Sequence, residues 1–223
     1  MNRRTLLLGS AATILVGGAV WMGLQDRASQ GSNLLVGMAE AQTTGDPSAI
    51  PDMVLGNPDA AVEVIEYASY TCPHCANFHA SAWPQLKADY IDTGKIKFVY
   101  REVYFDRFGL WASMIARCGG EMRFWGITDL IYERQREWIA GGSDPALIVE
   151  NLRKIGKTAG LDDAALDACM SDGETAQNLV AWYETNSKAD GITGTPSFII
   201  NGEKYSNMPW DEFKALLDGL LEA

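Results

Sequence analysis

The sequence predicts an α/β fold in which a mixed central sheet is flanked by helices and interrupted by an all-helical subdomain. Three observations predict it: two β-branched apolar runs separated by a helical pattern, a long stretch with helical patterns alone, and a hairpin signal near the C-terminus. These segments are 62–67 and 96–100 for the two strands, 108–190 for the helical stretch and 197–205 for the hairpin. A helix between two strands suits a parallel crossover and a hairpin is antiparallel, so the sheet is mixed.

The first helix is expected over residues 73–90, with Pro84 kinking it because proline cannot donate a backbone hydrogen bond. In the helical stretch, four residues share one helical face, and Asp144-Pro145 is a helix-start signal. The four residues are Leu110, Met114, Ile115 and Cys118. Asn201-Gly202 is the hairpin turn. A last helix is expected over residues 209–221.

The N-terminus carries an export signal. Arg3 and Arg4 precede an uncharged, mostly apolar run over residues 5–25. This run reaches transmembrane length, so a cleaved signal peptide and a retained N-terminal anchor both remain open. Residues 26–50 are small and polar, as expected of a flexible linker. Export places the rest of the chain in the periplasm, where disulfides persist.

The expected domain plan has five segments. A sheet-containing domain is split into two parts around the helical subdomain, after the signal and the linker. The signal or anchor covers residues 1–25, and the linker covers residues 26–50. The two parts of the sheet-containing domain are 51–107 and 191–223, and the helical insertion is 108–190. The net charge of −11 disfavours a nucleic-acid partner, since an acidic surface repels phosphates.

Cys72-Pro73-His74-Cys75, at the junction between a predicted strand and helix, points to thiol-disulfide exchange. Unpaired N–H groups and the helix dipole favour a thiolate at Cys72, and the His74 ring adds a donor or a positive charge. A stabilised thiolate stabilises the reduced pair, so the oxidised pair readily transfers its disulfide to the thiols of another protein. Cys75, one turn into the helix, is expected to be the buried resolving thiol.

Other readings of the two cysteines remain open. A zinc site would use Cys72, Cys75 and His79, but His74 is the only other histidine and only two further cysteines are available. A structural disulfide is the second alternative, because exported proteins use cysteines in that way. His79 is expected to be a residue on the helix surface. We expect no metal and no cofactor.

The order strand, Cys-Pro-His-Cys, helix, strand, helical insertion and then Gly194-Thr195-Pro196 before a hairpin resembles the DsbA-like branch of the thioredoxin superfamily. The resemblance covers about residue 53 to the C-terminus and implies a thioredoxin fold. It also implies a cis Thr195–Pro196 bond packed against the cysteines, with the Thr195 backbone available to an extended substrate segment. The prototype oxidases have valine before this proline, whereas threonine is common in isomerases and in many other DsbA-like proteins.

Glu66 shares a strand face with Val62 and Val64, so the pattern leaves it either solvated or buried below the cysteines. The resemblance favours the second reading, because the family has an acidic residue in the matching place. A buried carboxylate there would exchange a proton with Cys75.

Cys118 and Cys169 both lie in the helical stretch. An even cysteine count in an exported chain favours a structural disulfide between them over two buried free thiols. Closing a loop of about 50 residues would contribute roughly 4 kcal/mol in the entropic model.

The sequence therefore predicts a monomeric protein disulfide oxidoreductase of the cell envelope that oxidises reduced exported proteins. By resemblance, a quinone-linked membrane oxidase would re-oxidise the pair, and residues 5–25 would serve as a tether if retained. One rival is a disulfide reductase or isomerase with the same fold. The other is a non-enzymatic module, a holdase or a metal carrier, which uses the same thiols and groove for binding.

Overall fold

The computed structural model describes residues 45–223. The predicted signal or anchor at 1–25 and the predicted linker as far as residue 44 lie outside the described residues. In the part that is described, none of the helices combines the length and the apolar character needed to cross a membrane. The expected domain boundaries stay predictions.

Five strands form one sheet in the order β1-β3-β2-β4-β5. They are β1 (Met53–Gly56), β2 (Val62–Ala68), β3 (Ile96–Glu102), β4 (Ser197–Ile200) and β5 (Glu203–Ser206). β2 and β3 are parallel, and every other neighbouring pair is antiparallel, so the predicted mixed sheet is confirmed. β1 was not predicted, because this short edge strand has only one buried residue, Met53, and lacks a clear alternating pattern.

Helices fill most of the remaining chain. Before β3 lie the 3-10 turn η1 (Pro47–Ala49), α2 (Pro73–Ser81), α3 (Trp83–Leu86) and the π-helical segment η2 (Lys87–Ile91). Between β3 and β4 lie α4 (Arg107–Cys118), α5 (Glu121–Glu133), α6 (Gln135–Trp138), the 3-10 turn η3 (Ile139–Gly141), α7 (Pro145–Thr158), α8 (Asp163–Ser171) and α9 (Gly173–Ala189). The last helix is α10 (Trp210–Leu221). The stretch between β3 and β4 contains helices and turns, as the sequence pattern predicts.

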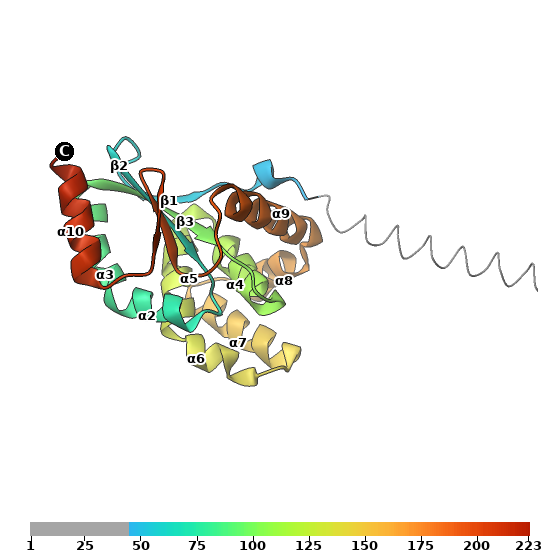
Figure 1. Cartoon of the computed structure of the whole chain (residues 1–223). Coiled ribbons are helices and arrows are strands. Elements are labelled where there is room, and N and C mark those ends of the chain that lie inside the picture. Colours follow the sequence, from blue (N-terminus) through green and yellow to red (C-terminus); the bar gives the residue numbers. More distant parts are fainter. Residues whose placement is uncertain (1–44) are drawn as a thin grey trace, which may run out of the picture. The chain divides into compact units, whose positions relative to one another are not determined.

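The sheet is covered on both faces. Val62 and Val64 of β2 belong to the larger core cluster, which also contains Phe213 of α10. Ile65 and Tyr67 point to the opposite face, because successive strand residues alternate, and Tyr183 of α9 packs there. Accordingly α10 and α9 lie on opposite sides of the sheet in Figure 1. At its carboxyl end, β2 leads into α2 through residues 69–72.

The single helix expected over residues 73–90 is divided into α2, α3 and η2. Ala82 separates the first two, and Pro84 lies in the first turn of α3, where its missing N–H costs least. The backbone at Ala82 is itself helical, and its N–H donates to the Phe78 carbonyl oxygen. The kink expected at Pro84 stays a prediction.

The hairpin between β4 and β5 turns at Asn201 and Gly202, which both have positive φ values of 47° and 86°. Asparagine and glycine tolerate this conformation better than other residues, as the sequence signal assumed. The Asn201 side chain also accepts a hydrogen bond of 2.8 Å from the Glu63 backbone N–H. The turn is thereby fastened to the start of β2.

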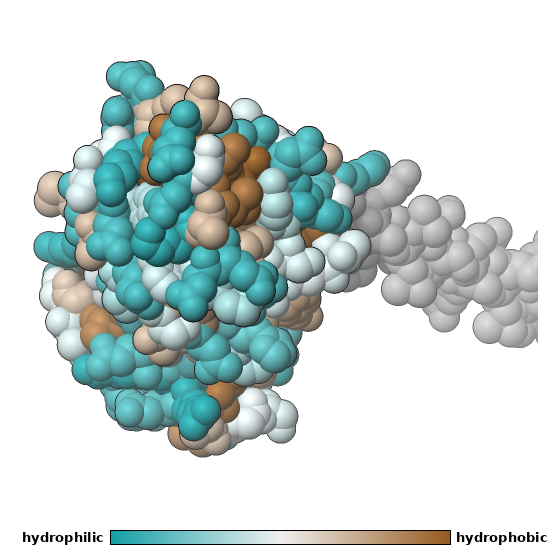
Figure 2. All heavy atoms as spheres, turned by 60° about the vertical axis from the view of Figure 1, so that its left-hand side comes forward, coloured by the Kyte–Doolittle hydropathy of each residue, from teal (hydrophilic) through white to brown (hydrophobic). Residues whose placement is uncertain are grey.

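The surface agrees with the acidic composition. On the face shown in Figure 2, hydrophilic side chains cover most of the surface, and hydrophobic side chains gather in a few separate patches. The described residues contain few large apolar side chains with substantial exposure; they are Val54, Phe105, Met122, Leu147 and Leu221. The five charged residues before residue 45 sum to +1, so residues 45–223 carry a net charge of −12.

Candidate active site

The two cysteines lie where β2 passes into α2. β2 ends at Ala68, and a turn follows in which the Cys72 backbone N–H donates a hydrogen bond of 3.0 Å to the Ser69 carbonyl oxygen. Cys72 is the N-cap of α2, with an extended backbone, and Pro73 occupies the first turn of the helix. Proline is favoured there because its fixed φ suits the helix and its N–H is not needed. Cys72 therefore lies where backbone N–H groups point outward and favour an anion.

Several donors lower the pKa of Cys72 to about 5, although its partial burial opposes this. The largest contribution is a hydrogen bond from Cys75, and the Thr195 side chain adds to it. The backbone N–H groups of Cys75 and His74 contribute as well. His74 thus acts through its backbone, whereas the sequence had pointed to its ring, which is exposed.

Cys75 has the opposite character. It is fully buried, and burial is the main reason why its pKa lies far above the usual value for a thiol. The hydrogen bond with Cys72 and the negative charge of Glu66 raise it further. Both cysteines are free thiols in this structure. At neutral pH the pair therefore holds one thiolate at Cys72 and one proton at Cys75.

Glu66 is fully buried on β2, on the face that the alternation with Val62 and Val64 indicated. Its Oε1 atom lies 3.3 Å from Nε2 of His79. Neither side chain has a properly aligned hydrogen-bond partner among the described residues. Two polar side chains buried in this way are costly to the fold, which favours a role in the site's chemistry.

The expectation that His79 lies on the helix surface is wrong. His79 is buried, and its ring stacks on that of Tyr132 with centroids 4.0 Å apart. The spacing contained the signal, because His79 follows the buried Cys75 by four residues and so shares its helix face. Among residues 45–223, no group of three or more histidine, cysteine and acidic side chains is arranged to hold a metal ion.

The loop before β4 completes the site. The Thr195–Pro196 peptide bond is cis, and the Thr195 carbonyl oxygen lies 3.4 Å from the Cys72 sulfur. The Thr195 side chain lowers the pKa of Cys75 as well as that of Cys72. The fold thus brings together two segments that are more than a hundred residues apart in the chain.

Cys118 and Cys169 form a disulfide, with their Cα atoms 5.7 Å apart. The bridge joins the last residue of α4 to α8, so both of its ends lie within the stretch between β3 and β4. Its geometry makes it a link between two helices of this stretch, and it uses neither thiol of the Cys72–Cys75 pair.

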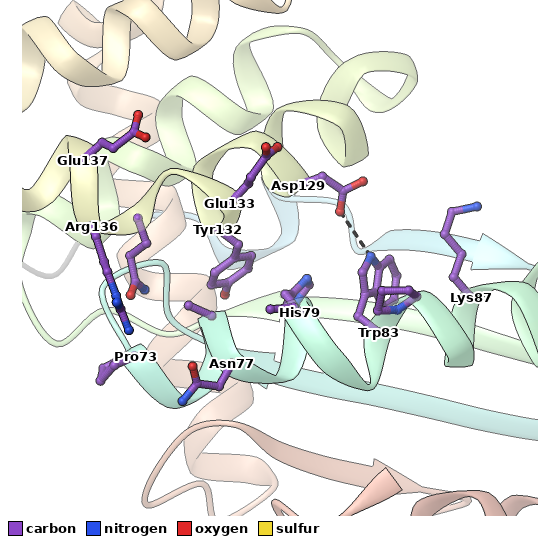
Figure 3. A pocket seen from close by; sticks show the side chains of 14 residues that line it. Pro73, Asn77, His79, Trp83, Lys87, Asp129, Tyr132, Glu133, Arg136 and Glu137 are labelled. Carbon is purple, nitrogen blue, oxygen red and sulfur yellow. Dashed lines mark hydrogen bonds between the residues drawn. The ribbon is translucent and has the colours of Figure 1, made fainter.

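A groove of about 790 Å³ runs along α2 and α3, with α5 and α6 forming the opposite wall (Figure 3). Three carboxylates, those of Asp129, Glu133 and Glu137, lie on that opposite wall. Trp83 donates a 3.1 Å hydrogen bond from Nε1 to Asp129 across the groove, drawn as a dashed line in Figure 3. The groove begins at Pro73, directly beside the cysteines.

One residue of the site was missed by the sequence analysis. Gln135, the first residue of α6, donates hydrogen bonds from Nε2 to the carbonyl oxygens of Tyr70 and Cys72. It lies in the charged segment Glu133-Arg134-Gln135-Arg136-Glu137, where nothing in the pattern distinguishes it from a surface residue. Only the tertiary contact reveals it.

Comparison with known proteins places these features in context. A family model described as thioredoxin matches residues 48–219. A Rickettsia bellii protein named a protein-disulfide oxidoreductase is 37% identical over 172 residues, which are 77% of this chain and 65% of that protein. The match thus spans less than two thirds of the Rickettsia protein's length. Disulfide bond formation protein D of Bacillus subtilis is 27% identical over 186 residues, with 78% of this chain and 79% of that protein covered.

Solved structures give the same result. The crystal structure of Wolbachia pipientis alpha-DsbA1 matches with a TM-score of 0.70 and 29% identity, over 78% of this chain and 92% of that one. A protein-disulfide isomerase from Novosphingobium aromaticivorans matches with a TM-score of 0.70 and 26% identity, over 77% and 98% of the two chains. The thioredoxin fold expected from the sequence is confirmed.

Proposed function

Because the chain belongs to the thioredoxin family, we propose that it is a thiol:disulfide oxidoreductase of the cell envelope that introduces disulfide bonds into exported proteins. The observation that carries the proposal is the contrast between the two thiols. The pKa of Cys72 is lowered to about 5, while burial holds that of Cys75 far above its usual value. A stable Cys72 thiolate favours the reduced pair, so the oxidised pair takes electrons readily.

The reaction proceeds through a mixed disulfide. A substrate thiolate attacks the Cys72 sulfur of the oxidised pair, the Cys72–Cys75 bond breaks, and Cys75 leaves and takes a proton. A second substrate thiolate then attacks the substrate sulfur of the mixed disulfide, and Cys72 leaves as the stabilised thiolate. The substrate gives up two electrons and two thiol protons. One proton remains on Cys75, and the other goes to the solvent.

Glu66 is proposed to pass a proton from the solvent to Cys75 when its sulfur leaves, and to return it to the solvent on re-oxidation. It is fully buried, its charge acts on the Cys75 thiol, and His79 lies beside it. Glu66→Gln is expected to slow the formation of the mixed disulfide by about 100-fold, the lower end of the effect of a positioned proton donor. Stopped-flow measurement with a cysteine peptide checks this.

Glu63→Gln is the matched control, since Glu63 lies on the same strand but forms an ion pair with Lys97 near the surface. Its rate should equal that of the unaltered protein. Equal rates in Glu66→Gln and Glu63→Gln would show that Glu66 takes no part in the proton transfer.

Thr195 and Pro196 are proposed to bind the substrate. The Thr195 carbonyl oxygen lies 3.4 Å from the Cys72 sulfur. An extended substrate segment would lie along this loop and pair with its backbone, as peptides do at strand edges. Its cysteine would then reach Cys72, which is the only one of the two thiols with any solvent access.

The cellular setting is part of the proposal. The basic start and the apolar run at residues 5–25 support export to the periplasm, where that run would tether the protein if it is retained. Reduced exported proteins are the proposed substrates, and a quinone-linked membrane oxidase is the proposed electron acceptor. The protein is proposed to act as a monomer without a cofactor.

A disulfide isomerase or reductase is the second candidate. Thr195 is compatible with it, because threonine at this place is common in isomerases as well as in many other DsbA-like proteins, and the Novosphingobium relative is named an isomerase. In that case the pair would rest in the reduced form and would need a reducing partner. The two candidates differ in the reduction potential of the Cys72–Cys75 pair.

The test is this potential, measured on the purified full-length protein in detergent by equilibration with glutathione buffers and thiol counting by mass spectrometry. We expect a value above about −180 mV at pH 7, whereas a value below about −230 mV would reject the oxidase and favour the second candidate. The Cys72→Ser variant cannot form the Cys72–Cys75 bridge, so its thiol count shows how completely the buried Cys75 thiol is detected.

The same titration repeated from pH 4 to pH 8 tests the thiolate. The lowered pKa of Cys72 stabilises the reduced folded form. This stabilisation is complete at pH values above the pKa of an unfolded thiol, and it is lost as the pH falls through about 5. Above that pH, reduction takes up one proton for two electrons, so the potential should change by about 30 mV per pH unit. Below it the slope should double to about 59 mV, because Cys72 is then protonated as well.

A further inference from the structure

Gln135 connects the helical stretch between β3 and β4 to the turn that carries Cys72. Its side chain is buried, and its Nε2 atom lies 2.8 Å from the Tyr70 carbonyl oxygen and 2.9 Å from the Cys72 carbonyl oxygen. An amide NH₂ group has two hydrogens, so each carbonyl receives one. The two carbonyls lie on either side of the Thr71–Cys72 segment, and the shared donor group holds them close to each other.

The turn is held from its other side by a separate contact. The Thr71 hydroxyl donates to Asp106 at 2.8 Å, and Asp106 is also the N-cap of α4. The Cys72 carbonyl already accepts the Ala76 backbone N–H at 3.2 Å, as the first bond of α2. Gln135 is therefore a second donor on the backbone carbonyl of the residue that carries the reactive sulfur.

These bonds affect the sulfur in two ways. Carbonyl oxygens carry partial negative charge, and donors that satisfy them and direct them away from a nearby thiolate reduce the repulsion it experiences. A fixed turn also keeps the first N–H groups of α2 directed at the sulfur. The backbone N–H groups of Cys75 and His74 are two of the donors that act on Cys72.

We propose that Gln135 is a positioning residue that holds the Tyr70–Cys72 backbone in the arrangement in which the Cys72 thiolate is stabilised. The proposal deepens the proposed function and rests on it, since it concerns the same thiol. It gives the helical stretch a direct part in the chemistry, because α6 contributes a side chain to the turn that the sheet and α2 create.

Gln135→Met tests the proposal, since methionine has a similar length but no donor. We expect the proton affinity of the Cys72 sulfur to rise about 3-fold to 10-fold, measured from the ultraviolet absorbance of the thiolate across a pH titration. The potential of the pair should then fall by about 15 to 30 mV. Gln135→Asn keeps the donors but is one methylene shorter, so it should give a smaller change of the same sign.

Gln85→Met is the matched control. Gln85 is exposed on α3, and its Nε2 atom donates to a backbone carbonyl, that of Ser81, at 3.2 Å. Its substitution removes an equivalent bond far from the turn and should leave the thiolate titration unchanged. Thermal unfolding of each variant shows whether it is folded, and Gln135→Asn decides the matter if Gln135→Met does not fold.

The proposal is overturned if the folded Gln135 variants titrate like the unaltered protein, if their proton affinity falls, or if Gln85→Met gives an equal rise. The titration needs no substrate, so it is independent of the proposed oxidase activity. A protein with a low potential would reject the oxidase while still allowing the role of Gln135 to be tested.

Discussion

Cys72→Ser is expected to reduce the oxidation of a dithiol peptide to the uncatalysed rate, because it removes the sulfur that is attacked in the disulfide and later leaves as a thiolate. Cys75→Ser is expected to abolish turnover as well but to retain capture. In that variant Cys72 has no internal partner, so a mixed disulfide with a substrate persists. The serine at position 75 still donates a hydrogen bond to the thiolate, so Cys72 should remain reactive.

Adducts resolved by non-reducing electrophoresis and mass spectrometry check both expectations. Cys75→Ser offered an activated disulfide should accumulate a covalent adduct at Cys72, and Cys72→Ser should accumulate none. Adducts at Cys75 in the Cys72→Ser variant would contradict the assignment, since Cys75 is fully buried. Rapid turnover by Cys75→Ser would show that the second thiol is dispensable.

Loss of the Cys118–Cys169 bridge is expected to cost about 4 kcal/mol of unfolding free energy. The two residues are 51 positions apart, and an open loop of this length gives the unfolded chain more conformations to lose on folding. The Cys118→Ala/Cys169→Ala variant should therefore unfold in urea about 2 M earlier than the unaltered protein, at an m-value near 2 kcal/mol/M.

The bridge should have little effect on the active site. The reduction potential of the Cys72–Cys75 pair in the double alanine variant is expected to equal that of the unaltered protein within a few millivolts. A loss of stability below about 1 kcal/mol would show that packing between α4 and α8 suffices without the bridge. A large change in the potential would instead reveal that the bridge takes part in the redox chemistry.

The sequence alone determined the layout of the fold and the reactive pair. Local signals are strong where one residue type has one structural use: Pro73 begins a helix, Asn201-Gly202 turns a hairpin, and the strand at 62–67 is rich in β-branched residues. The Cys72-Pro73-His74-Cys75 spacing is likewise local. It therefore predicts both the chemistry and the different roles that we propose for the two thiols.

Other features were decided by tertiary contacts. His79 was assigned to the surface, although it packs on Tyr132 and lies beside Glu66, because a helix has two faces and the residues that cover them come from elsewhere in the chain. β1 has too few residues for a pattern and exists because β3 offers it an edge.

The active site follows the same division. The sequence placed the two thiols in one turn and, by resemblance, identified the proline loop that faces them. The low pKa of Cys72, however, depends on groups that only folding brings close: the Thr195 side chain and the backbone at the start of α2. Gln135 belongs to this second class, since its effect requires α6 to pack against the turn. Sequence determines which groups can react, and tertiary structure determines the charge environment in which they do so.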